Sequence, residues 1–376
     1  MKPKFSFIDA QLSKIKKDHL YRRLYDNKVS GPYITIKKRN LVNLSSNDYL
    51  GLGSVKFTST QLQSSSRLVA GNDLLFKKLE DRLSYHKSQQ AALVFPTGYM
   101  ANLGIISILP QKNDLIISDN LNHASIIDSC RLARAEKTIY KHNDIEDLER
   151  NLRKKSRHKF VITEGIFSMN GDFAKLKEIS NLCQQYNAIL ILDDAHGDFV
   201  AGSDGRGSAA RLGVANKVDV YISSLSKGLG SFGGYVASRK NIVELAINTS
   251  RPFIYTSALP NFMVKIALDK FSSDREQRRI KLWMNVKRVR KGLESIGYAI
   301  ESQSQIIPII IGNEKKSLDF GRYLLNNGIF AQPIRYPTVE LGSARIRISV
   351  TAWLTEDVIN KSIDIFEKAG KKFKIL

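Results

Sequence analysis

The stretch "SSLSKGLGSFGG" (residues 223–234) decides the fold of this 376-residue chain. Gly228, Gly230 and Gly233 spell G-x-G-x-x-G, the glycine pattern that cradles the pyrophosphate of a dinucleotide. Lys227 stands directly before these glycines among small hydroxyl residues, as a lysine that forms a Schiff base would. The stretch therefore permits two interpretations, and its neighbours decide between them.

The residues after the glycines disfavour the dinucleotide interpretation. A dinucleotide site needs a strand, a glycine turn and then a helix, with an acidic residue about 20 residues further on. A strand is predicted at 218–224, but residues 235–237 (YVA) predict a second strand in place of the helix. Glu244 comes too early for the acidic residue. The glycines then serve to turn the backbone tightly beside Lys227.

The hydropathy pattern around this stretch predicts an α/β fold. Short, unalternated apolar runs are separated by helical segments from about residue 75 to 240, which is typical of a mostly parallel sheet covered by helices. We predict strands at 91–95, 115–119, 159–165, 188–194 and 218–224, and helices at 75–85, 100–109, 124–136 and 176–186.

The two ends of the chain follow a different, α+β pattern. Residues 9–30 predict a basic helix, followed by short strands near 33–36 and 41–44. After residue 275 we predict a long basic helix, strands at 306–311 and 344–350, a helix at 318–326 and a last helix. We therefore expect an N-terminal arm with short strands (1–45), a large domain (46–275) and a small α+β domain (276–376).

Polar side chains follow several of the predicted parallel strands. Asp193 ends one strand with His196 three residues later, Ser168 follows another strand, and His123 follows a third. Ligands bind at this edge of an open α/β sheet, so these side chains should meet Lys227 there. A carboxylate, imidazoles, hydroxyls and a lysine suit a pyridine cofactor: the carboxylate would keep the ring nitrogen protonated, and the lysine would hold the aldehyde.

The charge of the chain leaves its partners open. Lys and Arg number 58 against 36 Asp and Glu, a net charge of +22. The densest basic groups lie at 150–159 and 275–291, and the second keeps Ile280, Trp283, Val286 and Val289 at helical spacing, which indicates a solvated basic face. This dispersed pattern disfavours a nucleic-acid partner, whereas anionic substrates or acidic proteins fit at least as well.

The remaining composition points to a cytoplasmic enzyme. The longest apolar run, residues 188–192, is far shorter than the roughly 20 residues of a membrane helix, and no signal peptide is visible. Cys130 and Cys183 stand without metal-ligand spacing, so we expect ordinary thiols and no metal.

The sequence resembles the α-oxoamine synthases, a family of fold-type I pyridoxal-phosphate (PLP) enzymes. The resemblance covers nearly the whole chain. The matching stretches, in order, are LSSNDYLGL (44–52), SSRLVAG (65–71), FPTGYMANLG (95–104), NHASIIDS (122–129), TEGIFSMNGD (163–172), DDAHG (193–197), GRGS (205–208), SLSKGLGSFGG (224–234), IYTSALP (254–260) and IRYPTVELGSARIRIS (334–349).

The resemblance implies a role for individual residues. Lys227 matches the Schiff-base lysine, Asp193 the partner of the pyridine nitrogen, His196 the partner of the phenolic oxygen and His123 the stacking histidine, which also helps to position the substrate. The other implied cofactor contacts are Gly98 and Tyr99 in the phosphate loop, Ser168, Ser224, and, toward the phosphate of a neighbouring subunit, Thr256 and Ser257. The last two imply a homodimer with shared active sites.

The implied substrate contacts are less uniform. Asn47, Arg335 and Thr338 match residues around the substrate carboxylate and acyl chain, and Arg22 or Arg23 matches an N-terminal substrate arginine, for which we favour Arg22. Within the family, IRYPTV followed by ARIRIS, together with the compact length, favours the branch that condenses L-alanine with a pimeloyl thioester of coenzyme A or acyl carrier protein in biotin biosynthesis. Glycine C-acetyltransferase and serine palmitoyltransferase share most of the other motifs and stay open as alternatives.

Two departures from the family concern the acyl-thioester channel. Relatives often have a histidine where this chain has Phe76, and a glycine-rich segment is replaced by serines at 64–66. Neither departure touches the residues expected at the cofactor.

Overall fold

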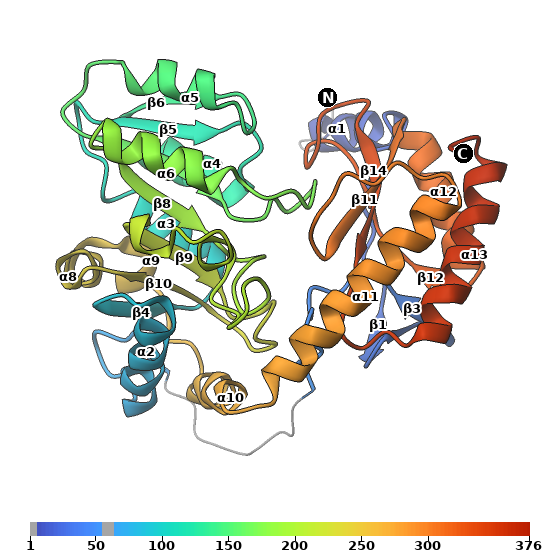
Figure 1. Cartoon of the computed structure of the whole chain (residues 1–376), viewed down its shortest axis with the longest axis horizontal. Helices are drawn as coiled ribbons and strands as arrows, with labels where there is room; N and C mark the ends of the chain where they lie inside the picture. The colour runs from blue at the N-terminus through green and yellow to red at the C-terminus, as the bar shows by residue number, and fades with distance from the viewer. Residues whose placement is uncertain (1–5, 55–63) are drawn as a thin grey trace. The chain divides into compact units, whose positions relative to one another are not determined.

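The computed structural model describes residues 6–54 and 64–376. The chain divides into two compact units (Figure 1), residues 47–281 and residues 1–46 together with 282–376. The first 46 residues, expected as a separate arm, therefore belong to the same unit as the C-terminal residues. The cause is strand pairing: β3 (Arg39–Asn43) pairs in parallel with β12 (Ile329–Phe330), with Val42 beside Ile329.

Residues 47–281 are built on a seven-stranded sheet. Its strands, in spatial order, are β4 (Ala91–Phe95), β10 (Gly234–Ser238), β9 (Val220–Ser224), β8 (Ile189–Asp193), β7 (Lys159–Glu164), β5 (Leu115–Asp119) and β6 (Glu136–Tyr140). Only β10 runs antiparallel to its neighbours β4 and β9. The other pairs are parallel, which confirms the mostly parallel sheet predicted from the sequence.

Helices cover both faces of this sheet (Figure 1), so the inner strands β5, β7 and β9 are buried along nearly their whole length, whereas the edge strand β6 is mostly exposed. Phe95, Ile116, Ile162, Ile191 and Val236 join one apolar core under α3 and α4. The helices are α2 (Leu74–Lys87), α3 (Gly98–Ile106), α4 (Ala124–Leu132), α5 (Ile145–Leu152), α6 (Leu176–Gln185), α7 (Ser208–Arg211), α8 (Lys240–Thr249), α9 (Arg251–Ile254) and α10 (Asn261–Phe271).

The glycines after Lys227 turn the chain straight back into the sheet. Gly230 and Gly233 have φ values of +65° and +111°, which L side chains rarely adopt. A Cβ on Gly234 would lie 2.4 Å from the backbone nitrogen of Gly98, so the two segments approach as closely as glycine allows. The strand β10 follows instead of a helix, which removes the geometry that a dinucleotide would need.

The second unit has two smaller sheets. One contains β1 (Asn27–Ser30), β2 (Tyr33–Ile36), β3 and β12, and the other contains β11 (Ile306–Gly312), β14 (Ala344–Ser349) and β13 (Pro333–Ile334). The helices α1 (Ser6–Lys17), α12 (Glu314–Asn326) and α13 (Glu356–Lys372) complete it, and α11 (Arg275–Ser295) runs from the first unit into the second. The α+β pattern matches the sequence prediction for this region.

Some predicted boundaries are wrong. The helix expected over 9–30 ends at Lys17, because His19 takes a φ of +56° and residues 27–30 pair with β2 as a strand. The helix expected over 124–136 ends at Leu132, because Ala133 is extended and Glu136 opens β6 beside β5. Long-range strand pairing overrides the local helical pattern at both sites.

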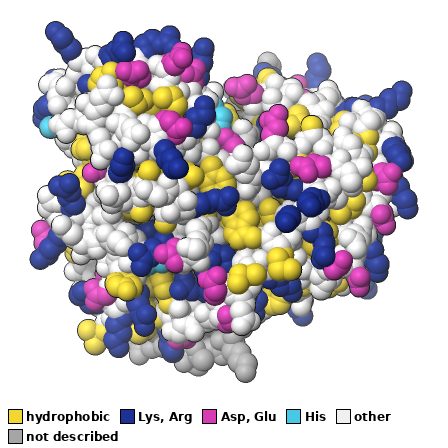
Figure 2. Space-filling view, in the orientation of Figure 1, with side chains coloured by type: hydrophobic (Ala, Val, Ile, Leu, Met, Phe, Trp, Pro, Cys, Tyr) yellow, Lys and Arg dark blue, Asp and Glu magenta, His cyan; other side chains and the backbone are white. Residues whose placement is uncertain are grey.

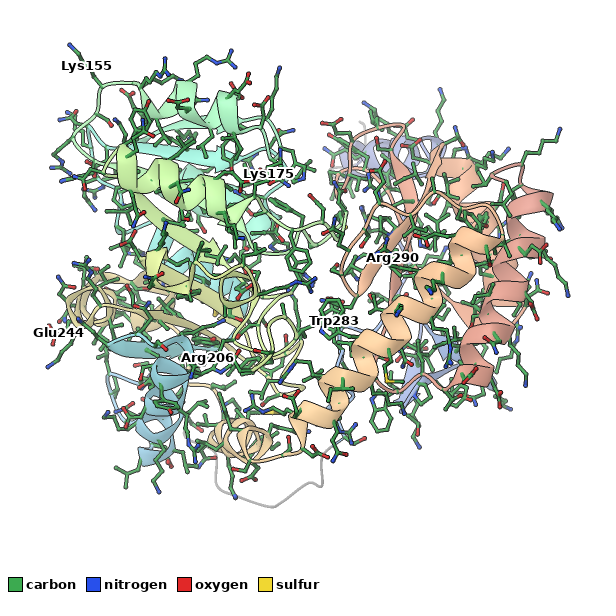
Figure 3. All side chains as sticks on the ribbon, in the orientation of Figure 1. Lys155, Lys175, Arg206, Glu244, Trp283 and Arg290 are labelled. Atoms are coloured by element: carbon green, nitrogen blue, oxygen red, sulfur yellow. The ribbon has the colours of Figure 1, made fainter. Side chains whose placement is uncertain are left out.

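The basic helix α11 also differs from its prediction. Its buried apolar side chains are Leu282, Val286, Val289 and Leu293, whereas Ile280 is 54% exposed. Lysine and arginine side chains are scattered among acidic ones on the face shown in Figure 2. Lys155, from the basic group 150–159, points outward (Figure 3) and is exposed. A dispersed charge of this kind gives no single strip for a nucleic-acid backbone on that face.

The departures at Phe76 and the serines are built into the packing of the first unit. Phe76 is fully buried, and the guanidinium of Arg67 lies 4.2 Å from its ring centroid. The carbonyl of Ser66 accepts a hydrogen bond from the Gly71 amide at 2.8 Å, and that of Ser65 accepts one from the Ala258 amide at 2.9 Å. These residues therefore fix the loop that follows them.

His142 fastens the edge of the sheet. Its Nδ1 lies 2.9 Å from Asp119 Oδ1 at the end of β5, and its Nε2 lies 2.8 Å from Asp172 Oδ2 in the turn after β7. The edge of the ring packs on Phe167 at a centroid distance of 4.3 Å. One imidazole thus joins two connections that lie far apart in the sequence.

Three further observations bear on the sequence predictions. Cys130 and Cys183 are buried free thiols. Across residues 6–54 and 64–376, no three His, Cys, Asp or Glu side chains are grouped to bind a metal ion. In the same residues, no helix combines the length and the apolar character needed to cross a membrane.

Candidate active site

A cavity of about 240 Å³ opens at the carboxyl ends of the parallel strands. Glu164, Asp193 and Ser224 end the strands β7, β8 and β9, and the register places Glu164 beside Asp193. The cavity is lined by Thr97, Gly98, Tyr99, Asn102, His123, Ser125, Glu164, Asp193, Ala195, His196, Ile222, Ser223, Ser224, Ser226 and Lys227.

Lys227 reaches the cavity from the glycine turn after β9. Its Nζ lies 3.1 Å from Nε2 of His196, and the side chain is partly buried. The amide of Gly230 donates to the Lys227 carbonyl at 3.0 Å, so the turn fixes the backbone from which this side chain extends. The amine is therefore held at one end of the cavity within reach of an imidazole.

Asp193 is held from two sides. Nδ2 of Asn102 donates to its Oδ2 at 2.7 Å, and the amide of Ala195 donates to its Oδ1 at 3.0 Å. The residue is only 7% exposed. These two donors fix the direction of the buried carboxyl group.

His123 caps the N-terminus of α4 and faces the same cavity. Its Nδ1 accepts a hydrogen bond from the Ser125 amide at 3.2 Å and lies 2.7 Å from the Ser125 hydroxyl. Burial lowers the pKa of His123, and Lys227 lowers it further against the opposing effect of Asp193. The ring is therefore neutral near pH 7 and can present its face to an aromatic ligand.

Glu164 brings a second carboxyl group beside Asp193. Burial, and then the charge of Asp193, raises the pKa of Glu164 well above its ordinary range. Its Oε2 accepts a hydrogen bond from the Ser168 amide at 3.2 Å, and its Oε1 has no hydrogen-bond partner within the described residues. The raised pKa favours the protonated form of Glu164 at this position beside Asp193.

The N-terminus of α3 forms another wall of the cavity. Thr97 caps this nine-residue helix by accepting a hydrogen bond from the Met100 amide, and Gly98 follows it. A Cβ on Gly98 would stand 3.2 Å from Cβ of Ser224, so the strand end and the helix end are in close contact. The Ser224 and Ser226 hydroxyls lie 2.8 Å apart. A helix N-terminus beside two hydroxyls suits a phosphate group.

A chain of hydrogen bonds links Asn47 to the lysine. The hydroxyl of Tyr49 donates to Asn47 Oδ1 at 3.1 Å and lies 2.7 Å from Nδ1 of His196, whose Nε2 faces Lys227. Tyr49 is fully buried. The Tyr49 hydroxyl thus lies between Asn47 Oδ1 and Nδ1 of His196 and holds the imidazole with its Nε2 toward Lys227.

The structure brings together seven of the residues singled out from the sequence: Gly98, Tyr99, His123, Asp193, His196, Ser224 and Lys227. Asn47 connects to them through Tyr49. Ser168 does not line the cavity, but its amide donates to Oε2 of Glu164 at 3.2 Å. Thr256 and Ser257 follow α9 and do not line the cavity of their own chain.

Three expected substrate residues belong to the other unit. There, Nη2 of Arg22 donates to the carbonyl of Tyr336 at 3.1 Å. The Thr338 amide donates to the carbonyl of Arg335, whose Nη1 in turn donates to the carbonyl of His19. These contacts fix Arg22 and Arg335 within their own unit.

Sequence reasoning missed Asn102, Ser125, Glu164 and Tyr49. Asn102 could have been found, because it follows Gly98 by four residues and therefore lies on the same face of α3. Ser125 and Glu164 lie within stretches that carry His123 and the end of β7. Tyr49 gives no such signal, since its partner His196 is 147 residues away.

Comparison with known proteins agrees with this geometry. The family model "Aminotransferase class I and II" matches residues 39–366. The chain belongs to this family.

Curated relatives and solved structures resemble the chain over most or nearly all of its length. An 8-amino-7-oxononanoate synthase from Thermoanaerobacter pseudethanolicus is 41% identical, with 98% of each chain covered. A solved serine palmitoyltransferase from S. paucimobilis, with a bound PLP–myriocin aldimine, is 28% identical with a TM-score of 0.91 and 99% of each chain covered. An 8-amino-7-oxononanoate synthase from Francisella tularensis is 28% identical with a TM-score of 0.74, covering 88% of this chain and 98% of its own. The family expected from the sequence motifs is confirmed.

Proposed function

We propose that the chain is a PLP-dependent acyltransferase that condenses L-alanine with a pimeloyl thioester to 8-amino-7-oxononanoate, in biotin biosynthesis. The observation that carries the proposal is the meeting of Lys227, Asp193 and His123 in one cavity at the strand ends. The full-length similarity to 8-amino-7-oxononanoate synthases supplies the choice of reaction.

The residues of the cavity fit PLP. The N-terminus of α3 and the hydroxyls of Ser224 and Ser226 suit the phosphate, and the Asp193 carboxylate suits a protonated ring nitrogen. His123 would lie on the face of the ring, and His196 would meet its phenolic oxygen. When bound, PLP supplies the electron sink that stabilises a carbanion on the amino acid.

The chain itself supplies attachment and proton transfer. Lys227 would hold the cofactor through Nζ and, once displaced by the amino group of alanine, would take the α-proton on the same atom. Asn102 and the Ala195 amide hold the Asp193 carboxyl group in the position where it would meet the ring nitrogen. In the overall reaction, the alanine α-carbon bonds to the thioester carbonyl, the thiol leaves with a proton, and the alanine carboxylate leaves as carbon dioxide.

The substrate residues and the assembly are part of the same proposal. Asn47, Arg22, Arg335 and Thr338 would contact substrate, and Thr256 and Ser257 would reach the cofactor phosphate of a second subunit in a homodimer. Ser168 would contribute through Glu164. We assign a cytoplasmic location, where the two buried thiols would stay reduced.

One observation favours a second candidate within the family. The serine palmitoyltransferase structure has a higher TM-score than the 8-amino-7-oxononanoate synthase structure, at equal sequence identity. Backbone similarity does not set the acyl chain or the amino acid, because these are chosen by side chains in loops.

A side-by-side assay distinguishes the candidates. We expect pimeloyl thioester with L-alanine to give the highest kcat/KM, above acetyl-CoA with glycine and palmitoyl-CoA with L-serine. Product identity is checked by mass spectrometry. Faster turnover of either competing pair would assign the chain to that other reaction and contradict the proposal.

The Tyr49 hydroxyl offers a test of how His196 is held. We expect Tyr49→Phe to lower kcat by roughly tenfold with little change in KM for alanine, because one buried hydrogen bond contributes about 1 kcal/mol. In the apoprotein, ¹⁵N NMR should show a change in the ratio of the two His196 tautomers.

The matched control is Tyr221→Phe. Tyr221 is also buried, but its hydroxyl donates to the Ala215 carbonyl at 2.9 Å, away from the cavity. An equal loss of kcat in both variants, or an unchanged His196 tautomer in Tyr49→Phe, would show that Tyr49 acts only on folding.

A further inference from the structure

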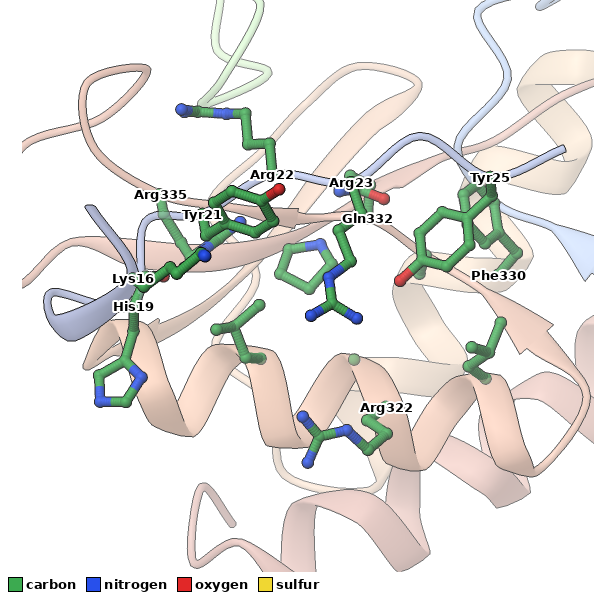
Figure 4. A pocket seen from close by; sticks show the side chains of 15 residues that line it. Lys16, His19, Tyr21, Arg22, Arg23, Tyr25, Arg322, Phe330, Gln332 and Arg335 are labelled. Carbon is green, nitrogen blue, oxygen red and sulfur yellow. The ribbon is translucent and has the colours of Figure 1, made fainter. Parts of the chain in front are cut away.

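A second cavity, of about 550 Å³, lies in the unit formed by residues 1–46 and 282–376, between the N-terminal segment and α12. Figure 4 shows the side chains around it. Its lining includes Lys16, Arg22, Arg23, Arg322 and Arg335, together with His19, and contains no Asp or Glu. The four of these Lys and Arg side chains other than Arg22 repel one another around one opening unless an anion lies among them.

Arg335 is a buried cation in this cavity. Its side chain is only 5% exposed, and its Nε is buried without a hydrogen-bond partner among the described residues. Burial lowers the pKa of Arg335, and Arg22 lowers it further against the opposing effect of Glu314. A buried guanidinium with an unused donor is costly, so the site is built for a group that accepts hydrogen bonds.

The exposed arginines have the freedom to bind such a group. Arg23 extends from the N-terminal segment toward α12, whereas Arg22 points away from the cavity (Figure 4). In the described residues, neither Arg22 nor Arg23 nor Lys16 forms an ion pair with a carboxylate. Arg322 pairs only with the exposed Asp319, at 3.1 Å on its own helix. Surface pairs of this kind contribute little and are easily exchanged.

The rest of the lining indicates an organic molecule rather than a bare ion. Leu318, Leu325, Phe330 and Pro333 give an apolar wall, and Tyr21 and Tyr25 add aromatic rings. The Tyr25 and Phe330 rings meet edge to face at 6.5 Å. A volume of this size holds a ligand much larger than one carboxylate.

We propose that this cavity binds the phosphate groups of a coenzyme A-type acyl donor. The inference rests on the proposed function for the identity of the donor, because both coenzyme A and the prosthetic arm of an acyl carrier protein carry phosphate on an organic chain. A planar guanidinium can donate two parallel hydrogen bonds to phosphate oxygens. Several arginines around one cavity therefore suit phosphate groups better than a single carboxylate.

Isothermal titration of the PLP-loaded protein tests the proposal, since the cofactor then occupies the other phosphate-binding site. We expect coenzyme A to bind with an affinity that falls as salt rises, and pantetheine, which lacks phosphate, to bind at least tenfold more weakly. Phosphopantetheine with intermediate affinity would assign the site to the arm shared with carrier proteins, and phosphopantetheine as weak as pantetheine would assign it to the nucleotide end of coenzyme A.

The double variant Arg23→Gln, Arg322→Gln should lose at least tenfold in affinity for coenzyme A while its visible spectrum still responds to L-alanine. Arg288→Gln, Arg290→Gln is the matched control. It removes the same charge from α11, where these arginines pair with Glu356 and Glu294 outside the cavity. Equal affinity in the first variant and wild type, or equal binding of pantetheine and coenzyme A, would overturn the proposal.

Two further outcomes separate the sources of error. If the double variant loses affinity for pimelate but not for coenzyme A, the cavity takes a carboxylate and the phosphate assignment is wrong. Because binding is measured without turnover, coenzyme A binding in a protein that fails to use pimeloyl thioester would contradict the proposed reaction and support the site.

Discussion

Replacing Lys227 with alanine should lower turnover by on the order of 10³-fold or more, because the variant loses both the covalent anchor of the cofactor and the base that takes the α-proton. The visible absorbance band of the bound cofactor should disappear with it. After borohydride reduction, mass spectrometry should find the cofactor on residue 227 of the wild-type protein and on no residue of the variant.

Lys240→Ala is the control for this prediction, since Lys240 is an exposed lysine at the start of α8. It should keep the band and the label. A variant lacking Lys227 that is still labelled at another lysine would show that the assignment from the glycine turn is wrong.

Replacing Asp193 with asparagine should leave some cofactor binding but remove most of the proton abstraction. The neutral amide cannot hold a proton on the ring nitrogen, and losing this charge-assisted contact costs several kcal/mol of barrier, on the order of a hundredfold or more in rate. Exchange of the alanine α-proton with deuterium, followed by NMR, measures this step without the acyl donor.

Asp204→Asn provides the comparison, because Asp204 pairs with Arg206 at the surface, 3.0 Å away. Its exchange rate should equal that of wild type. Near-normal exchange in Asp193→Asn would remove Asp193 from the role of ring-nitrogen partner.

The strand-end residues could be predicted because local pattern and topology agree there. The run AILILDD ends a buried parallel strand at Asp193, and parallel strands place their carboxyl ends at one edge, so Lys227 and Asp193 had to meet. The strand β10 could also be predicted, because residues 235–237 have no helical pattern. The chain returns to the sheet there without an intervening helix.

What the sequence could not predict depends on contacts between distant segments. The Tyr49 hydroxyl meets His196 although the two residues are 147 positions apart in the sequence. The strand β1 lies in a segment whose local pattern is helical, and its pairing with β2 overrides that pattern. Neither contact follows from periodicity, which reports only on neighbours along one element.

The hydrogen bonds of His142 to Asp119 and Asp172 give the protein a stability that depends on pH. Burial opposes a charge on this imidazole, but the hydrogen bonds to Asp119 and Asp172 outweigh burial and raise its pKa from 6.5 to about 9. The folded state therefore binds this proton more tightly than the unfolded chain, so the stabilisation is complete below about pH 6.5 and is lost as the pH rises through about 9. The difference in denaturation midpoint between wild type and His142→Gln should be largest at pH 6 and should shrink by pH 9.5. A difference that is the same at both pH values would mean that the ring acts by packing on Phe167 alone, and alkaline buffers would then not weaken this edge of the sheet.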